Sequence, residues 1–376
     1  MTARIGFCCK YLHAGDPVGN MRVCATDRDL NGTTTTVAWL NRQTVNVAEQ
    51  RLWDIMEHNI AAVGRMVELV GAGPVNQRMF RIGSELLPVY TEAHWRYFWQ
   101  RSDVRARCEQ LLAAVGARAR ELDVRLSFHP GQFCCLASDN AETVRRSLEE
   151  FEYHTDCARW MGYGTDWHDC GFKINVHLSG RLGAAGFRES LGRLSAEARN
   201  LITVENDEYQ GSLDDVIGLG DQVAVVMDIH HHLLNSHQYI QADDPRVQRV
   251  IDSWRGVRPV MHYSQSREDL LVGHDPEILP DIDQLLAQGY KKQKLRAHSD
   301  FLWNQACNRW ALTFADRYDI QVEAKSKNLA VQQLVDFWKN NPSDSVKEIP
   351  QPLAGVFDSQ LIDPATFSCA ESVALV

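Results

Sequence analysis

The chain has 376 residues, of which 44% are apolar and 23% charged, a composition typical of a globular protein with one large core. No apolar run is long enough to cross a bilayer and the first residues lack the layout of a signal peptide, so we expect a cytoplasmic protein without membrane contact. The formal net charge of −10 argues against broad, nonspecific affinity for nucleic acid, but it does not exclude local binding of DNA.

Short apolar runs alternate along the chain with longer segments of helical periodicity, the pattern of parallel strands covered by helices. Eight such runs predict a single (β/α)8 TIM barrel. The predicted strands are Arg4–Cys9, Arg78–Ile82, Val124–Phe128, Phe172–Val176, Leu201–Val204, Val223–Met227, Arg258–Met261 and Ile320–Val322. The predicted helices are Glu49–Val70, Val104–Leu122, Ala141–Met161, Ala185–Arg199, Pro245–Trp254, Pro280–Gln288 and Trp303–Arg317.

Two long connections and a tail complete the predicted organisation. His13–Asn41 is rich in Gly, Thr, Asn and Asp and predicts a long loop after the first strand, and a second insertion runs from Ser264 to Arg296. We assign residues 1–342 to the barrel and residues 343–376 to a C-terminal extension. The extension lacks clear periodicity, so we expect it either to wrap the barrel or to be partly mobile.

Potential metal ligands stand at the end of each predicted strand from the third to the eighth. They are His129, His177, Glu205, Asp228 with His231, His262 and Glu323. The carboxyl ends of parallel barrel strands meet at one face, so these side chains are expected to share one pocket. Imidazole nitrogens with carboxylate oxygens suit manganese, zinc, iron or magnesium, and several carboxylates permit bridging between ions. Six other histidines lie on predicted helices or loops and are interpreted as structural: His13, His58, His94, His154, His168 and His237.

Several ordered segments also carry a resemblance to a known family. They are Arg4-Ile5-Gly6-Phe7, Arg81-Ile82-Gly83-Ser84 with Pro88, His129-Pro130-Gly131-Gln132-Phe133, Val204-Glu205-Asn206-Asp207-Glu208, Asp228-Ile229-His230-His231, Met261-His262-Tyr263-Ser264, His298-Ser299-Asp300 and Val322-Glu323-Ala324-Lys325. Their order, over residues 4 to about 330, resembles that of the UV damage endonucleases. The resemblance implies a DNA repair endonuclease on a TIM barrel that acts on double-stranded DNA carrying lesions.

The resemblance also implies a site. Two or three divalent ions, manganese first with magnesium or zinc as alternatives, would be held by His129, His177, Glu205, Asp228, His231, His262, His298 and Glu323. Glu205 would bridge, and the catalytic residues would be Glu205, His129, His231 and Glu323. Metal-activated hydroxide would cut the phosphodiester 5′ to a UV photoproduct or another distorting lesion and leave a 3′-hydroxyl and a 5′-phosphate. A monomer without an obligate protein partner is expected.

DNA contacts are predicted around this site. Gln132 and Phe133 follow His129 and are candidates for a wedge in the base stack, although Phe133 could instead pack under its own loop. Phe7 and Tyr11 stand where the family has probing residues. Contacts to phosphates are expected from Arg81, Lys325, Lys327 and the basic segment 291–296.

Three departures from the family pattern bear on these expectations. Val260 stands where the family commonly has a lysine, so one ion site is expected to be altered or lost, and Phe133 replaces a common tyrosine. The wide spacing between His262 and His298 leaves His274 as an alternative ligand. Two other functions are also compatible with the residues: a metal-dependent sugar or sugar-phosphate isomerase, and a lesion-binding protein with weak or no cleavage.

Overall fold

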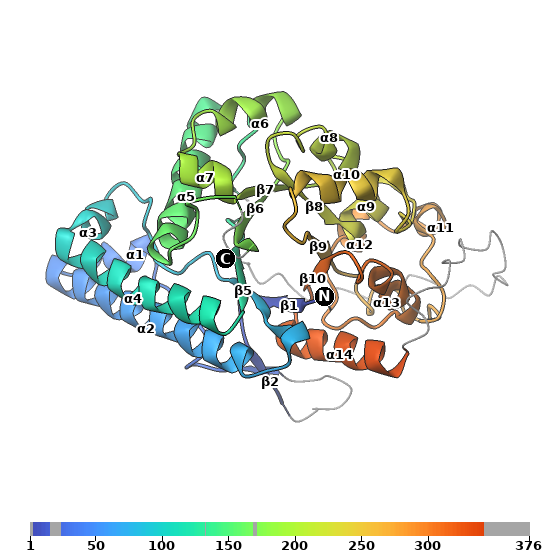
Figure 1. Cartoon of the computed structure of the whole chain (residues 1–376), viewed down its shortest axis with the longest axis horizontal. Coiled ribbons are helices and arrows are strands. Elements are labelled where there is room, and N and C mark those ends of the chain that lie inside the picture. The colour runs from blue at the N-terminus through green and yellow to red at the C-terminus, as the bar shows by residue number, and fades with distance from the viewer. Residues whose placement is uncertain (1–2, 16–23, 132, 168–170, 342–376) are drawn as a thin grey trace.

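Eight parallel strands close into a barrel in the computed structural model, which describes residues 3–15, 24–131, 133–167 and 171–341. This confirms the predicted TIM barrel (Figure 1). The strands are β1 (Ile5–Cys8), β4 (Met79–Ile82), β5 (Arg125–Phe128), β6 (Lys173–His177), β7 (Ile202–Glu205), β8 (Ala224–Asp228), β9 (Val260–Tyr263) and β10 (Asp319–Val322). Their order around the barrel is β1-β10-β9-β8-β7-β6-β5-β4, so that β4 closes on β1.

Helices surround the barrel, and the long α2 and α4 run side by side along one flank (Figure 1). The helices are α1 (Val37–Leu40), α2 (Val45–Gly71), the short η1 (Val75–Gln77), α3 (Arg96–Gln100), α4 (Ser102–Glu121), α5 (Ala141–Trp160), α6 (Gly183–Leu191), α7 (Ala196–Leu201), α8 (Leu213–Ile217), α9 (Ile229–Ser236), α10 (Pro245–Ser253), α11 (Ile282–Ala287), α12 (Lys292–Leu295), α13 (Gln305–Leu312) and α14 (Lys327–Asn340). Because helices cover the outside of the barrel, its strands are expected to be buried on both faces. All residues of β7 and β8 are indeed buried.

Two predictions about elements were wrong in detail. The single helix expected over residues 185–199 is two helices, because α6 ends at Gly192 and the Ser195 hydroxyl accepts a hydrogen bond from the Ala198 amide at the start of α7. The expected loop His13–Asn41 contains α1 and part of an antiparallel pair, β2 (Leu12–Ala14) with β3 (Cys24–Thr26). In the insertion 264–296, the helix predicted over Pro280–Gln288 is confirmed as α11, and the short α12 follows it.

The amino end of the barrel is closed by buried charges rather than by a site. The Arg125 guanidinium lies 2.8 Å from Asp319 Oδ2, and both side chains are at most 5% exposed. Arg258 holds the other oxygen of Asp319 at 2.9 Å. Because the active sites of TIM barrels lie at the carboxyl face, we interpret this network as structural. We therefore look for the functional site among the polar residues at the carboxyl ends of the strands.

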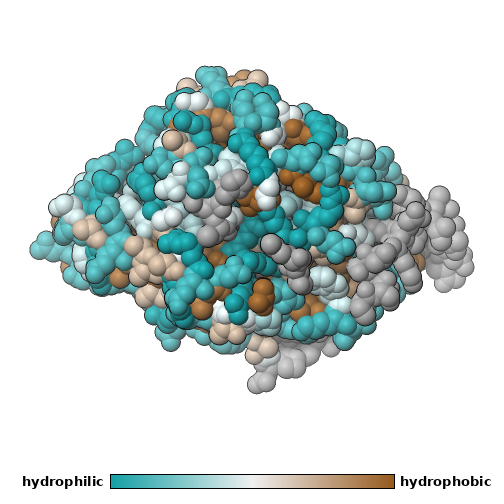
Figure 2. Space-filling model, viewed as in Figure 1, coloured by the Kyte–Doolittle hydropathy of each residue, from teal (hydrophilic) through white to brown (hydrophobic). Residues whose placement is uncertain are grey.

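The outer surface is mainly hydrophilic. On the face drawn in Figure 2, apolar residues form scattered spots among polar ones. Within the described part of the chain, no helix combines the length and the apolar character that a membrane span requires. The C-terminal extension 343–376 lies outside the described residues, so its predicted organisation stays a prediction.

Candidate metal centre

The predicted strand ends converge at the carboxyl face of the barrel. The register pairs His177 of β6 with Glu205 of β7, and Asp228 of β8 with His262 of β9. His129 follows β5 directly, and its ring centroid lies 5.0 Å from that of His177. Residues from five consecutive strands therefore meet in one pocket, as the sequence pattern predicts.

Glu205 stands at the centre of this cluster and is completely buried. Its Oε2 lies 3.1 Å from His262 Nδ1 and 3.5 Å from His129 Nε2, and its Oε1 lies 3.3 Å from His231 Nδ1. Two sets of donor atoms share it, one with His129 and His177 and one with Asp228 and His262, and within each set the atoms lie within 4.8 Å of one another. A carboxylate common to two sets has the placement that a bridging ligand requires.

Asp228 brings His231 into the cluster by starting helix α9. Its Oδ1 accepts a hydrogen bond from the His231 backbone amide at 2.7 Å, which is an N-cap. The next turn places the His231 ring so that Nδ1 lies 3.7 Å from Asp228 Oδ2. Of its two neighbours, His230 donates to the Leu295 carbonyl at 3.3 Å and His232 contacts the Ser236 hydroxyl. Only the central histidine of the triplet faces Glu205, as expected.

Glu323, at the end of β10, completes the other side of the pocket. Its Oε1 lies 3.4 Å from His262 Nδ1 and 2.5 Å from the Arg81 guanidinium, and its Oε2 lies 4.0 Å from His298 Nδ1. His274 instead contacts the Ile278 carbonyl within the insertion. The structure therefore brings His298 into the cluster and leaves His274 outside it.

The donor atoms fit a divalent cation because several of them are buried without a hydrogen bond to any described residue. Glu205 Oε1, Asp228 Oδ2, His262 Nδ1 and His177 Nδ1 make no hydrogen bond to any described residue. Buried polar atoms are normally paired, and those that are not need a physical reason. Nitrogen and carboxylate ligands at these atoms are the set that manganese, zinc or magnesium would take.

Electrostatics point in the same direction. Burial would raise the pKa of Glu205, but the positive charge of His262 and of the other histidines holds it well below its ordinary value. Burial raises the pKa of Asp228 to about 7. For His231, burial would lower the pKa, yet the charges of Asp228 and Glu205 outweigh it and hold the pKa well above its ordinary value. The cluster of carboxylates thus draws positive charge into the pocket, which a bound cation would supply.

The residues predicted to contact DNA fall in different environments. Phe133 is 83% exposed, so it does not pack under its loop, whereas Gln132 lies outside the described residues. Phe7 is only 5% exposed and stacks on Phe80 with ring centroids 5.8 Å apart. A ring buried in the core cannot reach a nucleic acid, so the expectation for Phe7 is corrected.

The other predicted contacts lie nearer the rim. Tyr11 is partly buried, with its ring edge-on to that of His13 at 5.5 Å. Lys325 is half exposed and lies 3.3 Å from Asp300, and Lys327 begins α14 with a left-handed backbone, φ 51°. Arg81 is 13% exposed and paired with Glu323, which makes it a neighbour of the cluster rather than a surface residue.

Val260 offers no donor atom at the base of this pocket. It lies on β9, two residues before His262, and packs against the buried Ala224, Val226 and Trp254. Lys173, the first residue of β6, is a lysine that also lies on a barrel strand. Its ammonium group donates a hydrogen bond to the Asn200 carbonyl at 2.6 Å. The described structure thus supplies no substitute amine from that residue.

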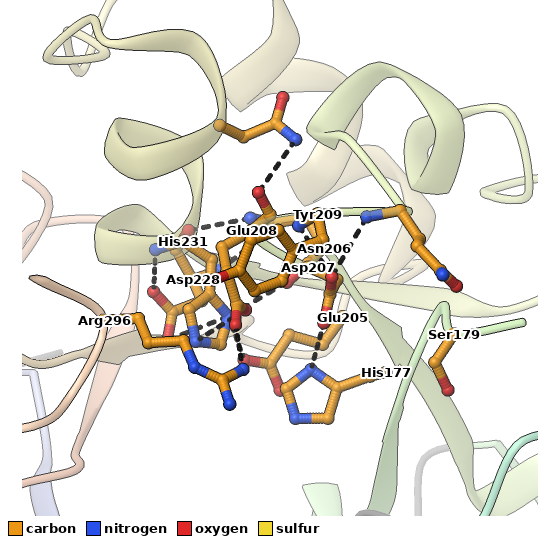
Figure 3. Close-up of polar contacts among 12 residues, drawn as sticks. His177, Ser179, Glu205, Asn206, Asp207, Glu208, Tyr209, Asp228, His231 and Arg296 are labelled. Carbon is orange, nitrogen blue, oxygen red and sulfur yellow. Dashed lines mark hydrogen bonds and ion pairs between the residues drawn. The ribbon is translucent and has the colours of Figure 1, made fainter. Parts of the chain in front are cut away.

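The sequence analysis did not predict two residues that contact the candidate metal ligands. Asn175 donates a short hydrogen bond to Glu205 Oε2, and it accepts one from the Thr203 hydroxyl at 2.9 Å. Glu208 pairs with Arg296, and its Oε2 lies 3.8 Å from His231 Nε2 (Figure 3). The alternation of a strand would have indicated Asn175, which shares a face with His177 two residues later.

Comparisons with known proteins identify the family of this chain. A UV-damage endonuclease of Neurospora crassa is 26% identical over 243 residues, which are 57% of this chain and 36% of that protein, so the chain spans about a third of this longer relative. A UV DNA damage endonuclease of Bacillus cereus is 21% identical over 77% of this chain and 83% of its own length. The crystal structure of SacUVDE, at 20% identity, shares the fold with a TM-score of 0.67 over 90% of this chain and 99% of that chain. The family model described as UV-endonuclease UvdE matches residues 5–353, and the chain belongs to this family.

Proposed function

We propose that this protein is a metal-dependent DNA repair endonuclease that nicks double-stranded DNA 5′ to UV photoproducts or other distorting lesions. One observation carries the proposal: in a chain of the UV-endonuclease family, Glu205 is shared by two sets of potential metal ligands at the carboxyl face of the barrel, one of them fully buried. The enzyme is proposed to act as a monomer without an obligate protein partner.

The ions would be held by the two sets around Glu205, with His231, His298 and Glu323 beside them. Manganese is the proposed metal, and magnesium or zinc are its alternatives. Divalent ions held by these residues would lower the pKa of water and stabilise negative charge on phosphate oxygens, chemistry that would leave a 3′-hydroxyl and a 5′-phosphate.

The protein's own part is to hold this donor set in place. Asn175 fixes one oxygen of Glu205, and Arg81 fixes one oxygen of Glu323 and balances its charge. The His129 ring donates from Nδ1 to the Pro130 carbonyl at 2.8 Å, which leaves Nε2 directed at Glu205. Partners of this kind fix the tautomer and the orientation of a ligand.

Recognition of a lesion is proposed to depend on DNA shape. A damaged duplex is easier to kink and to unstack than an intact one, and Phe133 presents an exposed apolar ring on the loop after β5, four residues after His129. An exposed ring is free to enter a weakened base stack. We therefore assign it to the base stack.

The deciding experiment is nicking of a UV-irradiated duplex in the presence of manganese, with an unirradiated duplex and a chelated reaction as controls and with the break mapped on both strands. Selective cleavage immediately 5′ to the photoproduct supports the proposal. Bound metal without cleavage of either duplex overturns it. A binding protein would then bind the irradiated duplex selectively, and an isomerase would convert a sugar or sugar phosphate.

A further inference from the structure

Tyr209 is a second exposed aromatic residue near the cluster, and it plays no part in the function proposed above. It lies four residues after Glu205 and is 50% exposed. The turn that presents it is held by Asp207, whose Oδ1 accepts hydrogen bonds from the amides of Tyr209 at 2.8 Å and Gln210 at 3.1 Å. The Asp207 amide in turn donates to the Gly211 carbonyl at 2.6 Å. The ring is thus presented by a bonded turn.

Two cations of the insertion after β9 lie against this ring. The Arg296 guanidinium carbon is 5.5 Å from the ring centroid and the Lys292 ammonium is 5.9 Å from it, within the range of cation–π contacts. Their helix α12 is anchored below, because the Leu295 carbonyl accepts hydrogen bonds from the Ser266 hydroxyl at 2.6 Å and from the His230 ring at 3.3 Å. The cations are therefore fixed relative to the barrel.

These residues also reach the candidate metal centre. Arg296 pairs with Glu208, and the other oxygen of Glu208 lies 3.8 Å from His231 Nε2 (Figure 3). The position differs from that of Phe133: β5 leads to Phe133 and β7 leads to Tyr209, and these two strands are two apart in the closed barrel of eight. The two exposed aromatic rings therefore belong to different loops at the carboxyl face.

We propose that Tyr209, Lys292 and Arg296, the Tyr209 platform, bind an unstacked nucleotide of the damaged duplex. The base stacks on the exposed part of the ring, and the two cations contact the backbone phosphate beside it. The inference rests on the proposed function and deepens it, since it assigns a binding position for a displaced base. The inference follows from the chemistry of these side chains. Every base has a π-face that can stack on an aromatic ring, and the phosphate next to it requires positive charge. The chain is acidic as a whole, but Lys292 and Arg296 provide positive charge beside the Tyr209 ring.

The test uses a duplex with a two-base mismatch that carries 2-aminopurine at one mismatched position, and a fully paired duplex of the same length. Binding is measured by anisotropy with cleavage suppressed by EDTA and, separately, with calcium in place of manganese. For Tyr209→Ala we expect about tenfold weaker binding of the mismatched duplex and loss of 2-aminopurine quenching, while Tyr209→Phe keeps both. Tyr97→Ala, at a 40% exposed tyrosine on α3, is the matched control and should bind like the wild type.

The cations are tested by salt dependence. Lys292→Ala should bind less tightly and reduce the slope of log affinity against log salt by about one, because one phosphate contact is removed. Lys339→Ala, at an exposed lysine of α14, should leave the slope unchanged.

Suppose that the wild-type protein binds the mismatched duplex selectively and that Tyr209→Ala binds it with the same affinity and the same quenching. This result would overturn the Tyr209 platform and leave the proposed function intact. Wild-type protein that binds neither the mismatched nor a UV-irradiated duplex would instead overturn the proposed function.

Discussion

Glu205 Oε2 lies 3.1 Å from His262 Nδ1 in the buried interior of the carboxyl face, and that ring nitrogen forms no hydrogen bond of good geometry. The other oxygen of Glu205 is also without a hydrogen-bond partner among the described residues. Leaving buried polar atoms unpaired costs free energy. A cation bound between the two side chains would satisfy both atoms, so metal binding should stabilise the fold as well as support catalysis.

Replacing the shared carboxylate tests this directly. Glu205→Gln keeps the size of the side chain and removes its charge, so we expect the fold to be retained and nicking to fall by about 100-fold or more. Manganese should raise the Tm of the wild type and have little effect on that of the variant, as measured by calorimetry with and without EDTA. Glu109→Gln, on the exposed face of α4, is the control. An unchanged manganese shift in Glu205→Gln would contradict the assignment.

The sequence predicted the barrel and much of the cluster because strand ends are local features. A buried run followed by His, Asp or Glu marks both the strand and its functional end, and this held at His129, His177 and Glu205. The helices α9 and α14 were missed for a related reason. Helix α9 begins directly after the motif residue Asp228 and α14 begins two residues after the motif residue Lys325, so their first turns were interpreted only as parts of a site.

Other features of the site could not be predicted, because they depend on tertiary contacts and not on the hydrophobic periodicity of the sequence. Phe7 has the sequence environment of an exposed probing residue, but β1 turns its ring onto Phe80 of the neighbouring strand β4. Arg296 and Glu208 are 88 positions apart and meet only because the insertion after β9 folds back over β7. Such pairs follow from the path of a long loop, which sequence patterns do not specify.

Acid should destabilise the protein through buried neutral histidines. Burial lowers the pKa of His154 to about 4 from the ordinary value of 6.5, so the unfolded chain binds a proton there between these values and the folded chain does not. Stability from this residue is complete above pH 6.5 and is lost as the pH falls through about 4, by roughly 3 kcal/mol. The change in unfolding free energy with pH, measured by urea denaturation in EDTA, should therefore be shallower in His154→Gln. Equal slopes in both proteins would contradict the prediction, and His94→Gln, at an exposed site, is the control.

Arg81 should matter for stability because its partner Glu323 is buried. The two side chains are 13% and 11% exposed and lie 2.5 Å apart, so Arg81→Met leaves an uncompensated charge. We expect a loss of about 3–5 kcal/mol in EDTA, partly restored by manganese, which would supply positive charge in the same pocket. Arg4→Met, whose partner Asp123 is 64% exposed, should cost about 1 kcal/mol or less. Similar losses in the two variants would show that Arg81 does not balance Glu323.

Phe133 should determine discrimination rather than stability or metal binding. Its ring is 83% exposed, so Phe133→Ala removes almost no packing, and its Tm and manganese content should equal those of the wild type. If the ring inserts into a weakened base stack, the ratio of nicking rates on irradiated and intact duplexes should fall about tenfold, a loss of ~1.4 kcal/mol. Val272→Ala, at an equally exposed position of the insertion, should leave that ratio unchanged. A wild-type ratio in Phe133→Ala would mean that lesions are distinguished elsewhere on the carboxyl face, and the exposed ring of Tyr209 would then be the next residue to examine.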